Sequence, residues 1–377
     1  MRKAPPSLFI ERGDRGVSQQ SMAKSPAPLK TNSRLLAICP IGIGNFLLLV
    51  PALAHLKKNR PDINLTLLSL KAGITSLALR YSFIDAVVTV DANQKQGMSA
   101  KLSLLKQLFR KFDVSISFFP SNRLEYNLLP FVAFIPRRVA YQYHSRSCGT
   151  FSWLNNTRVP VFDKLHDLTQ NFTAVHGLGL PLPEETGMPG FPLTETEKTF
   201  AADYVRKAGF EGKTLIGIHP GSSAEHHMDR KRWPVNRFAE LAALISKEKD
   251  ARFLIFGGPE EKEIKESLGS AIGKGAAVVD TKSLFETAAL IVKCSRFISN
   301  DSGLMHVATS LRVKTCGIFG PTADSRTAPF GRSILWYADR KSAPLAGPFK
   351  MWEEEKIAFT RISAVCRICR PNMCLRK

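Results

Sequence analysis

The stretch Ser299-Asn300-Asp301-Ser302-Gly303-Leu304-Met305-His306 joins an apolar strand to a helix. Phe297 and Ile298 end the strand, and apolar residues then recur with helical spacing (Leu304, Val307, Ala308 and Leu311). The polar residues at the junction are good N-cap residues. Free backbone N–H groups at a helix N-terminus, with the positive end of the helix dipole, bind anions such as a diphosphate. The stretch therefore predicts an α/β unit with an anion site at its strand–helix junction.

The polar residues of this junction have different expected roles. Gly303 lets a phosphate approach the backbone, and Ser302 adds a hydroxyl donor. Asp301 would repel a phosphate, so we expect it to cap the helix or to accept from a sugar hydroxyl. His306 lies one turn after Ser302 on the same helical face and can reach the phosphates. Two plainer interpretations stay open: the junction is only a helix cap, and His306 is a buried histidine with structural partners.

Strands and helices alternate along the chain, which predicts parallel sheets in two α/β domains. The first half has expected strands at 35–39, 65–70, 86–90 and 114–118 and expected helices at 46–58 and 100–110. The second half has expected strands at 215–219, 252–256, 276–279, 296–299 and 313–319, and expected helices at 234–247, from 259, and at 284–293. The proline-rich stretch 180–192 indicates a linker. We expect domains at 34–180 and 212–345, joined by a linker at 181–211.

Further motifs accompany the Asp301-Ser302-Gly303 junction. Along the chain they are Ile41-Gly42-Ile43-Gly44-Asn45, His219-Pro220-Gly221-Ser222-Ser223, Lys231-Arg232-Trp233-Pro234, and Phe319-Gly320-Pro321-Thr322 followed by Gly331. In this order and spacing they resemble the heptosyltransferase-type glycosyltransferases of family 9. The resemblance implies the GT-B form of α/β fold, with two Rossmann-like domains facing across a cleft. It also implies that the first domain holds the acceptor and the second holds the nucleotide-sugar donor.

Donor-binding residues are expected after the strands of the second half, because ligands of open α/β sheets bind at the carboxyl ends of the strands. Ser222 and Ser223 can donate to phosphate oxygens. The resemblance implies that Lys231 contacts the donor, and its charge, like that of Arg232, can stabilise a departing diphosphate. It also implies that Glu260 or its neighbour Glu261 accepts from the ribose, and Glu260 is our candidate. A solvated basic loop, and acids that stabilise a first helical turn, are the alternatives.

Acceptor-side residues are expected in loops of the first half: Gly44, Asn45, Arg123, Glu125, Tyr141 and His144. In the family that the chain resembles, an aspartate stands at the position that Asn45 occupies here, and this aspartate deprotonates the acceptor hydroxyl. An amide cannot take that proton, although it can orient the hydroxyl. We therefore expect Glu125 or His144 to act as the base, with Asn45 and Lys231 completing the catalytic set. A non-catalytic paralogue that only binds sugar nucleotide is the alternative, and ordinary surface charge explains the basic loop positions equally well.

A formal charge of +21 over 377 residues, spread along the chain, indicates an anionic partner. No recognised nucleic-acid module is present, so we expect a glycolipid or saccharide acceptor and peripheral contact with the inner face of an anionic membrane. The uncharged stretch 35–54 raises the alternative of a membrane anchor, but its prolines and glycines favour a strand, a loop and a helix. A missing third glycine argues against a dinucleotide fingerprint at Gly42-x-Gly44.

The two ends of the chain differ from its middle. Residues 1–33 are polar and basic and are expected to be a disordered leader. The tail 346–377 carries Cys366, Cys369 and Cys374, which are three ligand candidates where a structural zinc site needs four. Scattered cysteines in apolar surroundings indicate a reducing compartment, so we expect a cytoplasmic protein.

The resemblance, together with these patterns, implies an inverting glycosyltransferase that needs no metal or other cofactor. By resemblance, the donor is a nucleoside-diphosphate sugar, ADP-heptose, and the acceptor is a lipopolysaccharide core or related glycan. No acidic metal-binding pair accompanies the motifs, so basic residues and the helix dipole are expected to stabilise the diphosphate.

Overall fold

The computed structural model describes residues 28–39, 42–69, 71–90, 97–143, 150–222, 231–320, 322–330 and 333–337. His144, Ser223, Gly331, most of the expected leader and the whole cysteine-containing tail lie outside these residues. The chain divides into two compact units, Met1–Pro192 and Leu193–Lys377. The expected linker contains helix α6 (Glu195–Lys207), which packs against α9 (Leu284–Lys293) of the second unit.

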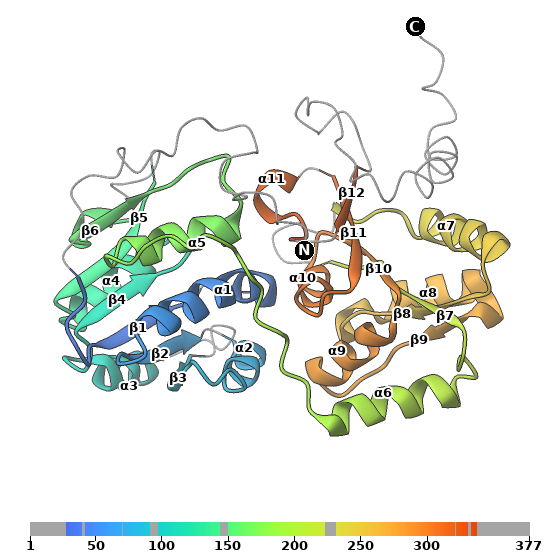
Figure 1. The fold of residues 1–377 in the computed structure, drawn as a ribbon, viewed down its shortest axis with the longest axis horizontal. Coiled ribbons are helices and arrows are strands. Elements are labelled where there is room, and N and C mark those ends of the chain that lie inside the picture. Colours follow the sequence, from blue (N-terminus) through green and yellow to red (C-terminus); the bar gives the residue numbers. More distant parts are fainter. Residues whose placement is uncertain are drawn as a thin grey trace, which may run out of the picture. The chain divides into compact units, whose positions relative to one another are not determined.

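The first unit is built on a six-stranded parallel sheet in the order β3-β2-β1-β4-β5-β6 (Figure 1). Its elements are β1 (Arg34–Ile38), α1 (Ile43–Asn59), β2 (Asn64–Ser69), α2 (Ala72–Ala78), β3 (Ala86–Thr89), α3 (Met98–Leu108), β4 (Val114–Ser117), α4 (Leu124–Val132), β5 (Arg137–Gln142), η2 (Ser152–Leu154), β6 (Thr157–Pro160) and α5 (Asp167–His176).

The second unit repeats this arrangement, with a parallel sheet in the order β12-β11-β10-β7-β8-β9. After α6 its elements are β7 (Thr214–His219), α7 (Val235–Glu248), β8 (Ala251–Ile255), η4 (Pro259–Glu261), α8 (Lys262–Ile272), η5 (Gly273–Gly275), β9 (Ala276–Val278), α9, β10 (Arg296–Asn300), α10 (Gly303–Ser310), β11 (Lys314–Phe319), α11 (Asp324–Thr327) and β12 (Ser333–Tyr337).

Both sheets follow the Rossmann strand order, in which the order reverses between the first and fourth strands. In the first unit this switch point lies between β1 and β4, where Ile38 pairs with Ser117. In the second unit it lies between β7 and β10, where His219 pairs with Ser299. Ligands of such sheets bind just beyond these strand ends. The sequence motifs around Asn45, His219 and Asp301 follow the strands that form the two switch points.

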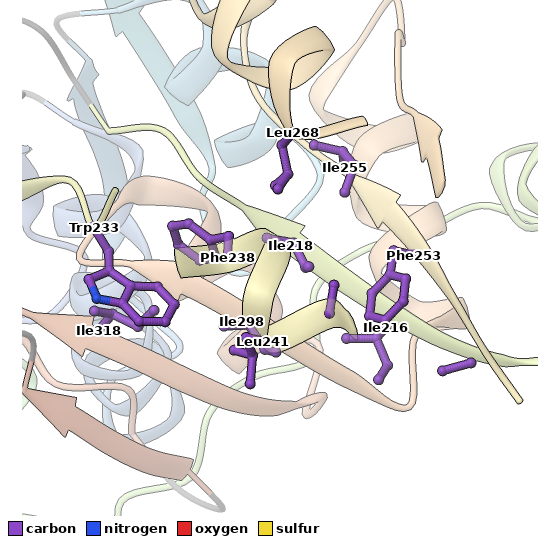
Figure 2. Packing of buried hydrophobic residues seen from close by; sticks show 12 residues of the cluster. Ile216, Ile218, Trp233, Phe238, Leu241, Phe253, Ile255, Leu268, Ile298 and Ile318 are labelled. Atoms are coloured by element: carbon purple, nitrogen blue, oxygen red, sulfur yellow. The ribbon is translucent and has the colours of Figure 1, made fainter. Parts of the chain in front are cut away.

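A large apolar cluster of the second unit forms between one face of its sheet and helices α7 and α8 (Figure 2). Strands contribute Ile216, Ile218 and Phe253, and α7 contributes Phe238. Trp233 is 6% exposed, and its ring meets that of Phe238 edge-on at 4.9 Å between centroids. Trp233 therefore packs in the core of the second unit. Its burial fixes the segment that carries Lys231 and Arg232.

The uncharged stretch 35–54 forms β1 and most of α1, as the strand–loop–helix interpretation predicts. None of the helices in the described part of the chain combines the length and the hydropathy needed to cross a bilayer. Helix α1 begins at Ile43, three residues earlier than expected, after Gly42 with a φ of +114°. This angle strains any residue with a side chain, so glycine suits the turn. Gly44 and Asn45 therefore lie in the first helical turn, and their expected loop placement is wrong.

Candidate functional site

Polar side chains gather at the switch point of the second unit and are buried there. His219 ends β7, and Ser299 and Asn300 end β10; each is at most 4% exposed. The Asn300 amide donates to the Pro220 carbonyl (2.7 Å) and accepts from the Trp233 backbone N–H (2.9 Å). One side chain thus ties the loop after β7 and the segment before α7 to the end of β10. The hydrogen bonds of Asn300 bring the three donor-side motifs together.

Lys231 and Asp301 form an ion pair with 3.0 Å between Nζ and Oδ2, and both side chains are about nine-tenths buried. The expectation that Asp301 caps α10 is wrong, because Ser302 is the N-cap and accepts from the Met305 N–H (3.4 Å). A carboxylate beside a buried ammonium compensates its charge. The Lys231 charge is therefore already neutralised, and a phosphate must compete with Asp301 for it.

Helix α10 begins at Gly303, directly after this ion pair. Its N-terminus offers the backbone donors that the sequence predicts for an anion. His306 is 6% exposed and is engaged with neighbouring groups, as the alternative of a buried histidine with structural partners requires. Its expected contact with phosphates stays a prediction.

His219 links the N-cap of α10 to a buried glutamate. Its Nδ1 lies 2.9 Å from Ser302 Oγ, and its Nε2 lies 2.9 Å from Glu261 Oε2. Burial raises the pKa of Glu261, but the hydrogen bond and charge of His219, the Gly258 N–H and the charge of Arg232 together outweigh it and hold the pKa below its ordinary value. Glu261 is therefore an ionised carboxylate, which can only accept hydrogen bonds. In the contact with Glu261, His219 Nε2 thus carries a proton and is the donor.

Arg232 reaches back to the loop after β7. Its guanidinium donates from Nε to Ser222 Oγ (3.2 Å) and from Nη2 to the Ser222 carbonyl, and it lies 4.0 Å from Glu261 Oε1. Ser222 is only 1% exposed, so it lies inside this network rather than on a solvated loop. Gly221 makes the close packing possible, because a Cβ there would overlap the Glu261 carboxylate.

The two neighbouring glutamates of η4 have different surroundings. Glu261 is 6% exposed and accepts from the Gly258 N–H (2.8 Å) in addition to its contact with His219. Glu260 is exposed. The structure therefore leaves Glu260, our candidate for the ribose, as the glutamate that is open to an incoming ligand.

Sequence reasoning chose no site role for His219 or Asn300 and preferred Glu260 to Glu261, yet His219, Asn300 and Glu261 hold the cluster together. The signal for His219 was its position as the last residue of an apolar strand, directly before Pro220-Gly221-Ser222. Glu261 was weighed together with Glu260, and only burial separates them. The resulting site contains two cation–carboxylate pairs, Lys231 with Asp301 and Arg232 with Glu261. This site can bind a diphosphate if phosphate oxygens replace the Asp301 carboxylate as the partner of the Lys231 ammonium group.

The switch point of the first unit also carries polar groups after β4. The Phe119 N–H donates to Asn171 Oδ1 (2.9 Å), and the Ser121 N–H donates to the Tyr143 hydroxyl oxygen (2.7 Å). Ser121 Oγ and Asn122 Oδ1 are buried and lack a hydrogen-bond partner among the described residues. Buried polar atoms of this kind are rare in native proteins, and a ligand can satisfy them. Sequence reasoning missed both residues, because only their burial distinguishes them.

Several acceptor-side residues were expected in loops and lie elsewhere. Tyr141 lies within β5, is 2% exposed, and donates its hydroxyl to the Gln170 carbonyl; burial raises the pKa of Tyr141 well above its ordinary value. Arg123 is the exposed N-cap of α4, and Glu125 is exposed in the first turn of that helix. Loop placement of Tyr141 and Glu125 is therefore wrong. The cause is that β5 and α4 contain charged residues and a proline, which hide their periodicity.

Two Rossmann-like domains in one chain, with a polar site at the switch point of each sheet, define the GT-B class of fold. The model of glycosyltransferase family 9 (heptosyltransferase) matches residues 101–344, more than half of the chain. The chain therefore belongs to glycosyltransferase family 9 and is a glycosyltransferase.

Individual relatives agree with the family. Lipooligosaccharide heptosyltransferase 2 of Haemophilus ducreyi is 24% identical over 315 residues, which cover 80% of this chain and 87% of that protein. A family 9 glycosyltransferase structure from Veillonella parvula is 19% identical, with a TM-score of 0.72 over 92% of this chain and all of the other. The structure of E. coli ADP-heptose lipopolysaccharide heptosyltransferase II is 19% identical, with a TM-score of 0.65 over 88% of this chain and 98% of the other.

Proposed function

We propose that the protein transfers a heptose from ADP-heptose to the core of a lipopolysaccharide or a related glycan. The names of its relatives, which are heptosyltransferases for lipopolysaccharide or lipooligosaccharide, support this substrate class. The observation that carries the donor role is the buried Lys231–Asp301 ion pair beside the N-terminus of α10. This arrangement supports the donor role, because it combines one cation with several backbone donors, the groups that bind a diphosphate at a helix N-terminus.

The donor side acts on the leaving group. In the proposed complex, phosphate oxygens accept from the first N–H groups of α10 and from Lys231, which turns away from Asp301. Asp301 can then accept from a hydroxyl of the sugar, and Glu260 from the ribose. When the acceptor oxygen attacks the anomeric carbon, the bond between that carbon and the diphosphate oxygen breaks, and ADP leaves with the electron pair. Lys231 and the helix dipole stabilise the charge that develops on ADP.

The acceptor side takes the proton of the attacking hydroxyl. Asn45 orients this hydroxyl from the first turn of α1, next to Gly44. We assign the base role to Glu125, an exposed carboxylate in the first turn of α4; His144, outside the described residues, is the other candidate. Arg123, beside Glu125, is available for an anionic substituent of the acceptor. Attack from the face opposite the diphosphate inverts the anomeric centre.

A second candidate function is binding of sugar nucleotide without transfer, and Asn45 is the observation that favours it. An amide at this position cannot accept the proton of the acceptor hydroxyl. Transfer activity in the wild-type protein separates the two functions, because a binding protein is stabilised by nucleotide but does not release ADP.

The test combines two measurements on the full chain. ADP, UDP and GDP are compared by thermal shift, and we expect ADP to raise the melting temperature most, because a ligand of the native state stabilises it. ADP release is then followed with ADP-heptose and a deacylated core oligosaccharide. Stabilisation without turnover, together with turnover in Asn45→Asp, would leave the binding function standing.

We further propose a cytoplasmic location, with peripheral association to the inner face of an anionic membrane. In the described part of the chain Cys39, Cys294 and Cys316 form no disulfide, which is typical of a reducing compartment. The charge of +21 favours an anionic surface.

A further inference from the structure

Exposed apolar side chains concentrate on one part of the first unit. Of the ten large hydrophobic residues that are exposed in the described part of the chain, eight lie between Leu102 and Trp153. Scattered exposed leucines are normal, but a contiguous apolar area marks an interaction site. The area is defined here by Phe109, Leu124, Leu128, Phe131, Phe134 and Trp153, which are 37% to 61% exposed, and is called the α3–α4 surface.

The α3–α4 surface is continuous. Leu124, Leu128 and Phe131 follow one another at helical spacing along the outer side of α4. Phe109, at the end of α3, contacts Phe134 at 5.4 Å between ring centroids. Both helices cover the same face of the sheet, because residues of each belong to one buried cluster with β1.

Helix η2, which carries Trp153, is held against α4 by two hydrogen bonds. The Asn127 amide donates to the Thr150 carbonyl, and the Asn155 amide donates to Asn127 Oδ1, both at 2.7 Å. Trp153 is therefore part of the same rigid area rather than of a separate loop.

Arginines lie among the apolar groups of this surface. The guanidinium of Arg110 lies 5.4 Å from the ring centroids of both Phe109 and Phe134, and that of Arg138 lies 5.5 Å from the Phe131 ring. Along α3, α4 and the residues beside them the chain has six basic residues (Lys101, Lys106, Arg110, Lys111, Arg123 and Arg138) and two acidic ones (Asp113 and Glu125). One of the acids, Asp113, is paired with Arg34 at 2.8 Å. The surface is therefore both apolar and strongly cationic.

We propose that the α3–α4 surface docks on an anionic lipid bilayer. Aromatic rings and leucines enter the boundary between headgroups and acyl chains, while the surrounding lysines and arginines contact anionic headgroups. Charge argues against a second copy of the chain on the same surface, because two such cationic faces repel each other. The inference rests on the proposed function, because an acceptor that is linked to a lipid is reached only at a membrane. Leu124 follows β4 closely, so the docked bilayer lies near the acceptor side of the sheet.

The test measures sedimentation of the full chain with vesicles of phosphatidylethanolamine and phosphatidylglycerol. The variant Leu128→Ser/Phe131→Ser changes two exposed residues of the surface, and Leu79→Ser/Val292→Ser changes two exposed apolar residues elsewhere. We expect the first variant to bind vesicles about 10-fold more weakly and the control to bind like the wild type. Lys106→Gln/Lys111→Gln should weaken binding to these vesicles and leave binding to phosphatidylcholine vesicles unchanged.

Stabilisation by ADP and activity with a deacylated acceptor serve as controls for folding and for the proposed transfer. Both should be unchanged in Leu128→Ser/Phe131→Ser, because neither side chain belongs to the donor or acceptor residues. Wild-type vesicle binding in this variant would overturn the surface assignment. So would a wild-type protein that ignores vesicles and instead dimerises, or binds an acidic protein, through these residues. If the wild-type protein binds vesicles normally but does not transfer sugar to the soluble acceptor, the proposed function is overturned and the membrane-docking surface is not.

Discussion

Lys231 and Asp301 together set the state of the donor site before a ligand enters. Each is buried, and each has the other as its charge partner. Removing one member of a buried ion pair leaves an uncompensated charge, which is more destabilising than removing both. This asymmetry separates the role of Lys231 in structure from its role in transfer.

We expect Lys231→Ala to lower the rate of transfer about 100-fold or more, through loss of a charge that stabilises the leaving diphosphate. It should also lower stability by about 3 kcal/mol or more, because Asp301 is left unpaired. The double variant Lys231→Ala/Asp301→Asn should recover most of the stability and none of the transfer. Chemical denaturation and steady-state kinetics measure the two effects. Recovery of transfer in the double variant would remove Lys231 from the reaction.

Asn45 and Glu125 have different proposed roles: Asn45 positions the acceptor hydroxyl, and Glu125 accepts its proton. Asn45→Ala should lower activity roughly 10-fold to 100-fold through lost orientation of the acceptor hydroxyl. Glu125→Gln should lose considerably more, because an amide cannot accept the proton of the acceptor hydroxyl. Arg123→Gln, at the neighbouring exposed position, is the control and should change KM more than kcat. If Glu125→Gln retains wild-type turnover, the base lies elsewhere, and His144→Ala is the next variant.

Among the structural elements, the loop after β7 depends on close packing at Gly221. The His219–Glu261–Arg232 contacts hold this loop against η4 and α10, and the space at Gly221 is taken by the Glu261 carboxylate. Local sequence allows this loop many conformations, and the buried network selects one.

Gly221→Ala should therefore displace Glu261 and weaken its hydrogen bond with His219. We expect a loss of stability of about 1–3 kcal/mol, typical of overpacking, and weaker ADP binding. Gly190→Ala is the matched control, because a Cβ at Gly190 meets nothing within 4 Å. Thermal unfolding with and without ADP measures both effects. Equal behaviour of the two variants would show that the packing at Gly221 is unimportant.

The lowered pKa of Glu261 predicts how this network responds to pH. A carboxyl group whose pKa is lower in the folded state contributes stability that is complete above its unfolded value and is lost as the pH falls through its folded value. With an ordinary value of 4.5, the difference in unfolding free energy between wild type and Glu261→Gln should stay constant from pH 7 to about pH 5. It should shrink at lower pH. A difference that grows on acidification would contradict the assignment of Glu261 as a carboxylate.

For the whole molecule, the distribution of charge is the feature with the clearest consequence. Its formal charge of +21 gives long-range attraction to any anionic surface, whereas apolar contacts at the α3–α4 surface act only at short range. The two contributions respond differently to salt, which allows them to be separated.

Raising the salt concentration should weaken association with anionic vesicles, because the Debye length falls from about 10 Å at 0.1 M to about 3 Å at 1 M. We expect binding of the wild type to fall at least about 10-fold over this range and to leave a remainder that Leu128→Ser/Phe131→Ser removes. Sedimentation at a series of salt concentrations measures both parts. Attachment that ignores salt would show that charge contributes little.

The sequence by itself determined the class of fold, strands β1 to β4 of the first sheet and β7 to β11 of the second, and the donor-side motifs. Long apolar strands and helices with regular spacing carry this information locally. Elements whose periodicity is hidden were missed: β5 begins with two arginines, and α5 buries Gln170 and Asn171 through hydrogen bonds to backbone groups and to Thr173. Propensity cannot reveal them, because their buried polar residues are stabilised by specific partners that the folded chain brings together, such as the Phe119 N–H for Asn171.

Only the tertiary structure decided which side chains of the motifs meet. Lys231 and Asp301 are 70 positions apart, and His219 lies 42 positions from Glu261 and 83 from Ser302. Parallel pairing of β7 with β10 brings these segments to one edge of the sheet, and such pairing is a property of the whole domain. Burial then separates Glu261 from Glu260 and places Tyr141 in the core. The sequence shows which groups are available, whereas burial and charge pairing depend on neighbours that only the folded chain supplies.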